Sequence, residues 1–263
     1  MRSVWKGHIR FSLVTIPIQV FSAVETKNNI SFNQLHKEDN GRVGYKKTCK
    51  SCNEVLKPKD IVKGYEYEPD QYVVLTKDEL SAVKLKSTRA IDIEAFVDIS
   101  EVHPSRFEAV YFVGPDGDVA KQPFQLFLQT IKKSNKAGIG RIILRDREDV
   151  VVMVPEGSAI IMYKLRYPYE LRDITKVPDT EEIEVDESQL KLAQTLVDSL
   201  ATTFEEIDFE DRYHEALMEL VNKKIEGEEI VTAPDTETST PTVNIMDALK
   251  ASIEQSKNLK KGA

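Results

Sequence analysis

Short segments in which apolar and polar residues alternate recur through residues 1–176, and they limit the fold more than any other feature of the sequence. In residues 4–13 the apolar side chains share one face, which carries Trp5, Ile9, Phe11 and Leu13. Alternation of this kind is typical of half-buried β-strands. Pro17 limits the next strand, predicted at 18–24, to a start or an edge. The remaining strands are predicted at 30–36, 72–75, 90–99, 110–113, 139–145, 149–154 and 159–167.

Helical periodicity appears in fewer places. Thr76 and Glu79 form a T-x-x-E capping box, which predicts a short helix over 77–84. Apolar residues three or four apart predict an amphipathic helix over 121–133, whose apolar face holds Phe124, Phe127, Leu128 and Ile131. Two more amphipathic helices are expected at 187–204 and 211–225. We therefore predict a mixed α+β chain in which β-structure dominates.

The segment from 37 to 63 interrupts the strand pattern. It holds eight Lys or Arg residues against four Asp or Glu, a net charge of +4, and few large apolar side chains. A segment this long without an apolar face cannot bury a core of its own. We interpret this segment, 37–63, as an arm that projects from the β-scaffold and offers cations to an anionic partner. The alternative is a solvated loop that binds nothing.

The charge of the chain is segregated. The whole chain carries −8, yet residues 1–176 carry +5 and residues 177–263 carry −13. Because salt screens a charge within roughly 10 Å, an acidic protein can still hold a basic groove. We expect a core domain at 1–176, an acidic helical region at 177–226 that packs on the core or on a partner subunit, a disordered linker at 227–243 and a short terminal helix at 244–263.

Basic side chains share one face in each of three predicted strands, 4–13, 139–145 and 159–167. The residues concerned are Lys6, Arg10, Arg141, Arg145, Lys164 and Arg166. A single basic strand face is more often solvated than functional. Three such faces in one domain could line a continuous basic cradle.

Signatures of catalysis are missing from the sequence. The glycines at 138 and 140 lack the lysine and the spacing of a P-loop, and there is no G-x-S-x-G or H-E-x-x-H. The four histidines are dispersed along the chain. We conclude that the protein is not an enzyme. A run of about 18 apolar residues and a signal-peptide core are also missing, so a cytoplasmic protein is expected.

Cys49 and Cys52 form a C-x-x-C pair, which has the ligand spacing of a tetrahedral metal site. A structural zinc site needs four ligands, which two subunits could supply, or which His36 could help to complete. The Pro-interrupted context fits a thioredoxin-like redox pair poorly. Inert thiols are the third interpretation. No cofactor is otherwise expected.

Long collinear segments of the sequence resemble the bacterial Ku family of DNA end-binding proteins. The resemblance rests on VWKGHIRFSLVTIPIQVFSA at 4–23, ISFNQLHKED at 30–39, KDIVKGYEYEPDQYVVLTKDEL at 59–80, AIDIEAFVDISEVHP at 90–104, IGRIILRDRE at 139–148 and LRYPYELRD at 165–173. It covers residues 2–173 nearly end to end, with similar helical sequence to about residue 225.

The resemblance implies a β-barrel core and a homodimer in which an arm from each barrel closes a ring around duplex DNA. Residues 25–66 occupy the position of that arm. It also implies recruitment of an ATP-dependent DNA ligase for non-homologous end joining, at the nucleoid. The ligase contact of the family lies C-terminal to the core, so we expect it in the segment 244–259, on Ile245, Leu249 and Ile253. This chain stops after KNLKKGA and lacks the long lysine-rich tail of some members.

A ring of this kind contacts phosphates and sugars and ignores base sequence. The predicted phosphate contacts are Lys6, Arg10, Lys37, Arg42, Lys46, Lys47, Arg141, Arg145, Lys164 and Arg166. The alternative interpretation of each residue is a solvated surface charge that binds nothing. Two rival functions stay open: an open-groove nucleoid or regulatory DNA-binding protein, and an acidic interaction scaffold that never touches DNA.

Overall fold

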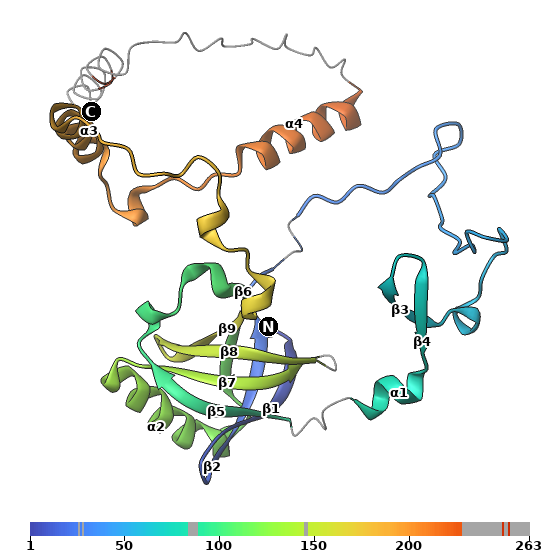
Figure 1. Ribbon diagram of the computed structural model, residues 1–263, viewed down its shortest axis with the longest axis horizontal. Helices are drawn as coiled ribbons and strands as arrows, with labels where there is room; N and C mark the ends of the chain where they lie inside the picture. Colours follow the sequence, from blue (N-terminus) through green and yellow to red (C-terminus); the bar gives the residue numbers. More distant parts are fainter. Residues whose placement is uncertain are drawn as a thin grey trace. The chain divides into compact units, whose positions relative to one another are not determined.

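The computed structural model describes residues 1–25, 27, 29–83, 89–144 and 147–227, together with Leu249 and Ser252. The chain divides into two units, Met1–Lys176 and Val177–Ala263. Figure 1 shows the first unit as a β-barrel with a long excursion between its second and fifth strands. Within the described ranges, no helix combines the length and the apolar character needed to span a bilayer.

Seven strands close into a barrel in the spatial order β1-β2-β6-β9-β8-β7-β5. Their bounds are β1 Ser3–Phe11, β2 Val14–Ser22, β5 Ala90–Val97, β6 Phe107–Pro115, β7 Ala137–Leu144, β8 Arg147–Glu156 and β9 Ala159–Leu165. All neighbours are antiparallel except β1 and β5, which close the barrel in parallel. Closure pairs each of these seven barrel strands on both sides, so the barrel itself offers no open strand edge to another chain. The predicted β-dominated α+β class is confirmed.

The core is built from the alternation that the sequence shows. Ile9, Ile16 and Ile18 are fully or almost fully buried together with Met162 of β9. Helix α2 (Asp118–Ser134) packs against these strands and buries the four predicted side chains, Phe124, Phe127, Leu128 and Ile131. A 17-residue helix amid strands is therefore held by one apolar face, as its periodicity predicts.

Two details of the first hairpin differ from the prediction. Leu13 is 98% exposed, because the chain turns at Ser12, whose φ is 51°. β2 begins at Val14, so Pro17 lies inside the strand and not at its start. The carbonyl of Pro17 accepts a hydrogen bond from the N–H of Asp116, on the side away from β1. Pro17 therefore costs no hydrogen bond of the β1–β2 ladder.

The strand predicted at 30–36 is wrong. Only an isolated bridge, Leu35 to Arg42, forms there. A segment with strand-like sequence needs a neighbouring strand to become one, and residues 30–36 have none among the described residues. The arm instead ends in a separate two-stranded sheet of β3 (Lys63–Glu68) and β4 (Gln71–Leu75).

Short helices complete the first unit. Helix α1 (Lys77–Ala82) begins with the predicted capping box, in which the N–H of Thr76 donates to the Glu79 carboxylate and the N–H of Glu79 donates to the Thr76 hydroxyl oxygen. Single turns of 3₁₀-helix lie at Pro58–Asp60, Ile99–Glu101, Pro104–Arg106, Pro168–Glu170 and Ile174–Lys176.

The second unit contains α3 (Glu187–Leu200), a 3₁₀ turn at Phe204–Glu206 and α4 (Arg212–Glu226). Asp186 caps α3 by accepting hydrogen bonds from the N–H groups of Ser188 and Gln189. α3 ends four residues earlier than predicted, because Ala201 is already extended. Neither helix buries a residue, so their packing on the barrel or on another subunit stays a prediction.

Candidate nucleic-acid interface

The strand cations of the barrel already have anionic partners. Nζ of Lys6 lies 3.0 Å from Oδ1 of Asp116, in the turn before α2. Arg10 pairs with Asp92, the residue opposite it across the parallel β1–β5 contact. The hydrogen bond from Arg10 to Asp92 raises the pKa of the guanidinium. Such exposed pairs are weak, but each carboxylate cancels most of the positive potential that its cation offers a phosphate.

Arg141 on β7 is paired twice. Its Nε lies 2.7 Å from Glu94 on β5, and its Nη1 lies 3.0 Å from Glu148 on β8. These two hydrogen bonds raise the pKa of the Arg141 guanidinium. The partners come from the strands on either side, so the cross-strand register brings them together.

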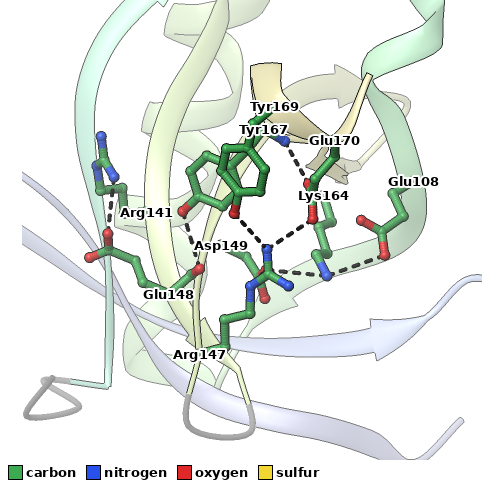
Figure 2. A network of polar contacts seen from close by, with 9 residues as sticks. All are labelled: Glu108, Arg141, Arg147, Glu148, Asp149, Lys164, Tyr167, Tyr169 and Glu170. Atoms are coloured by element: carbon green, nitrogen blue, oxygen red, sulfur yellow. Dashed lines mark hydrogen bonds and ion pairs between the residues drawn. The ribbon is translucent and has the colours of Figure 1, made fainter. Parts of the chain in front are cut away.

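Lys164 belongs to a polar network at one end of the barrel, shown in Figure 2. It follows Ile160 and Met162 on the core face of β9, and its side chain is only 18% exposed. Nζ lies 3.2 Å from Oδ1 of Asp149 and 3.3 Å from Oε1 of Glu108. Burial lowers the pKa of Lys164, but the two carboxylates outweigh it and raise the pKa overall. Lys164 is thus held as a buried ammonium.

Arg147 extends the same network toward the surface. Its Nη2 lies 3.1 Å from Oε1 of Glu170, and its Nε lies 3.7 Å from Oδ1 of Asp149. A backbone hydrogen bond from Tyr167, followed by the bond from Arg147, lowers the pKa of Glu170. Beside Lys164 and Arg147 is a pocket of about 450 Å³, which Trp5 also lines.

The arm presents its cations differently. Lys37, Arg42, Lys46 and Lys47 are all exposed. Among the described residues none of these four has a carboxylate within ion-pair distance. The arm therefore keeps its full positive charge available to a polyanion, whereas the strand cations do not.

Two predicted contacts fall elsewhere. Arg166 is exposed just past the end of β9, and its backbone bonds to that of Arg106. Arg145 lies outside the described residues. Eight of the ten predicted residues therefore fall into two groups: four ion-paired cations on the barrel, and four cations on the arm that have no ion-pair partner among the described residues. DNA contact by either group stays a prediction.

Cys49 and Cys52 lie in a tight turn of the arm and are not joined by a disulfide. Backbone N–H groups of Cys52 and Ser51 donate to the sulfur of Cys49 and lower the pKa of its thiol. Among the described residues, no three His, Cys, Asp or Glu side chains lie close enough together to hold a metal ion.

Comparison with protein families settles the membership of the chain. The model of the Ku family, described as "Ku70/Ku80 beta-barrel domain", matches residues 10–192. The chain belongs to the Ku family. As a Ku-family member it is a non-catalytic protein, as its sequence predicts.

Relatives in this family align over nearly the whole chain. A protein of Heliobacterium modesticaldum named "Non-homologous end joining protein Ku" is 35% identical, over 99% of this chain and 94% of its own length. Proteins of the same name from Bacillus subtilis and Archaeoglobus fulgidus are 36% and 35% identical, over 98% and 97% of this chain and 83% and 99% of their own lengths.

Sequence reasoning missed the carboxylates that neutralise the Ku barrel cations: Glu94, Asp92, Asp116, Glu148 and Asp149. A partial signal was present, because Asp92 and Glu94 share the polar face of the predicted strand 90–99. Which cation they meet depends on strand register, which the alternation of one segment cannot reveal.

Of the predicted ligase-docking residues, only Leu249 is described, as helical and half-buried. Ile245 and Ile253 lie outside the described residues, as do the linker predicted at 227–243, apart from Gly227, and most of the terminal helix predicted at 244–263.

Proposed function

We propose that the protein binds the ends of duplex DNA as a ring-shaped homodimer, without regard to base sequence. The observation that carries this proposal is the arm, where Lys37, Arg42, Lys46 and Lys47 are exposed and lack carboxylate partners among the described residues. The printed name of the relatives, non-homologous end joining protein, supports a role in joining broken ends. Phosphate contacts of this kind carry no base information.

The mechanism is topological. An arm of about 40 residues from each subunit, folded back once on itself, reaches at most roughly 70 Å at 3.3 Å per residue, and the turns at 34–43 and 47–56 shorten that reach. A closed ring loads only where a duplex ends. The cations inside it release counterions from the DNA, so affinity falls steeply with salt.

Linear and sealed DNA distinguish this ring from its rivals. We expect light scattering to show that the protein is a dimer. It should bind a linear fragment well and a covalently closed circle of the same sequence and length poorly. Protein loaded on a linear fragment whose ends are then capped with biotin-bound streptavidin should stay bound when salt is raised.

An open groove predicts the opposite pattern: equal binding to the circle and the linear fragment, with full release by salt from capped fragments. An acidic scaffold predicts no binding to either DNA. A monomer that holds sealed circles as tightly as cut fragments contradicts the ring directly.

We further propose that the segment 244–259 recruits the ATP-dependent DNA ligase of the end-joining pathway, with Ile245, Leu249 and Ile253 as the docking face. These three residues recur on one line of a helix, and a short isolated helix is marginal in water until a partner covers its apolar line. DNA binding by the arm does not depend on this segment.

We expect the triple variant Ile245→Glu, Leu249→Glu, Ile253→Glu to lose its ability to stimulate end joining by the cognate ligase. The reason is that the apolar docking line is lost. Affinity for linear DNA should stay unchanged in a gel-shift assay. The matched control is Ser252→Glu, an exposed position in the same segment. Stimulation that survives the triple substitution, or that Ser252→Glu removes equally, contradicts the docking face.

A further inference from the structure

The arm contains a turn, residues 34–43, that is closed by a specific set of backbone hydrogen bonds. The N–H of His36 donates to the carbonyl of Gly41 at 2.8 Å, and the N–H of Asn40 donates back to His36 at 2.9 Å. Val43 bonds to Gln34 at 2.9 Å and closes the base. Asn40 has a left-handed φ of 57°, which lets the chain reverse.

A second turn, residues 47–56, repeats this pattern. The N–H of Cys49 donates to the carbonyl of Glu54 at 2.9 Å, and the N–H of Asn53 donates back to Cys49 at 2.8 Å. Leu56 bonds to Lys47 at 2.8 Å, and Asn53 has a φ of 58°. Isolated bridges, Leu35 to Arg42 and Thr48 to Val55, stand at the same place in each turn.

The two turns match residue by residue with a constant offset. His36 corresponds to Cys49, Asn40 to Asn53 and Gly41 to Glu54, each 13 positions apart. The same offset places Asp39 on Cys52. The H-x-x-D of the first turn is therefore the structural counterpart of the C-x-x-C of the second.

Each turn brings its two potential ligands together. Nδ1 of His36 lies 2.9 Å from Oδ1 of Asp39, and Cys49 and Cys52 lie in the single turn that the bond from the N–H of Asn53 to the carbonyl of Cys49 closes. Imidazole nitrogen, carboxylate oxygen and thiolate sulfur are the ligands that Zn²⁺ takes in proteins, and structural sites use four of them. Together the turns supply four, in two pairs with the same x₂ spacing.

The arm also lacks a buried core, and a bound metal would supply the stability that a core otherwise gives. No residue described between 29 and 66 is buried, although both turns are ordered by hydrogen bonds. Segments that cannot bury a core commonly gain their stability from metal ligation.

We propose that His36, Asp39, Cys49 and Cys52 of one chain bind a single Zn²⁺ and thereby join the two turns of the arm. Since no three of these side chains lie within metal distance of one another in the described residues, binding draws the turns together about residues 44–46. Zinc replaces the hydrogen bond between His36 and Asp39. It also fixes Lys46 and Lys47, which lie between the two ligand pairs in the sequence.

The test is metal binding by the full-length protein, with no DNA present. We expect one zinc per chain by elemental analysis. Titration with Co²⁺ should give the visible absorption of a tetrahedral site and thiolate-to-cobalt charge-transfer bands. We expect a loss of metal affinity of at least about tenfold in each of four variants: His36→Ala, Asp39→Asn, Cys49→Ala and Cys52→Ala. Substituting a residue that only supports a ligand already lowers metal affinity about 10- to 100-fold.

Two kinds of variant sharpen the result. Glu38→Gln and Lys50→Gln change exposed polar side chains inside the same turns at positions that neither ligate the metal nor contact a ligand, and they should keep full metal affinity. Asp39→Cys completes a His–Cys₃ set, so it should tighten binding and strengthen the charge-transfer bands. None of these side chains is buried, so circular dichroism of the barrel should stay unchanged in every variant.

Several results would overturn the proposal. One is a protein that takes up no stoichiometric metal. Another is half a zinc per chain that depends on Cys49 and Cys52 but not on His36 or Asp39, which indicates a Cys₄ site shared between two copies. Loss of DNA binding without any change in metal content affects the function proposed above and leaves the zinc site standing.

Discussion

Replacing the four arm cations, Lys37, Arg42, Lys46 and Lys47, with glutamine is expected to abolish measurable binding to linear DNA at 0.1 M salt, a loss on the order of 10⁷-fold for the eight contacts of a dimer. Each phosphate contact releases about 0.9 counterion, so each lost contact removes nearly one power of the salt concentration from the binding constant. Because a dimer carries eight of these cations, the plot of log affinity against log salt should lose a slope of about 7. Fluorescence anisotropy across salt concentrations measures both quantities.

The matched control removes cations that the barrel already neutralises. The paired substitutions Lys6→Gln with Asp116→Asn and Arg10→Gln with Asp92→Asn remove each cation together with its carboxylate, so they leave the net charge of the barrel unchanged. We expect a change in slope well below one per residue. If the barrel set flattens the salt dependence more than the arm set does, the phosphate groove lies on the barrel face.

The difference between arm and barrel also marks what the sequence alone could predict. Periodicity within one segment was enough to find β7, β8, β9 and the buried face of α2, because burial on one face leaves its mark on consecutive residues. The same rule failed at 30–36, where alternation exists but no neighbouring strand does.

Pairing between distant segments could not be predicted. Arg10 meets Asp92 because β1 and β5 close the barrel in parallel, 82 residues apart in the sequence. The sequence showed three basic strand faces but did not show that carboxylates of neighbouring strands sit beside them. Register sets those contacts, and a slip of two residues would pair each cation with another side chain while leaving the apolar pattern intact.

The matched turns of the arm were also beyond the sequence pattern. C-x-x-C is a familiar spacing, whereas H-x-x-D carries little signal until backbone hydrogen bonds place Asp39 where Cys52 stands in the second turn. The candidate ligands of the first turn therefore emerge from geometry, with His36 alone foreseen.

Lys164→Met is expected to destabilise the barrel by about 3 kcal/mol, although Lys164 was predicted to bind phosphate. Its Nζ lies 3.2 Å from Asp149, whose side chain is 5% exposed. Removing one partner of a buried ion pair leaves the other charge without compensation, at a cost of about 3 to 5 kcal/mol. The lower end applies because Arg147 lies 3.7 Å from the same carboxylate. The shift in urea midpoint of the barrel transition measures the loss.

Removing the charges of both Lys164 and Asp149 tests whether the loss of stability comes from leaving Asp149 unpaired. In Lys164→Met with Asp149→Leu the one carboxylate left without Lys164 is Glu108, which is 32% exposed and so reaches water, and most of the lost stability should return.

The dependence of the stability on pH has a definite sign. The pKa of Lys164 is raised on folding, so its contribution is complete below the ordinary lysine pKa and fades only as pH rises through the raised value. The parent should therefore lose stability relative to the double variant only in strongly alkaline solution.

The two roles of Lys164 make opposite demands on this variant. A phosphate-binding lysine must reach solvent. Its loss should lower DNA affinity and reduce the salt slope by about one for each subunit, about two for the dimer, without affecting unfolding. The charge of a lysine held between Asp149 and Glu108 is neutralised by these ion pairs within the protein. Its loss should lower the unfolding midpoint, while DNA affinity at low temperature stays near that of the parent. A normal midpoint with weakened DNA binding would restore Lys164 to the interface. The reverse result assigns the barrel a structural role and leaves the capture of DNA to the arm.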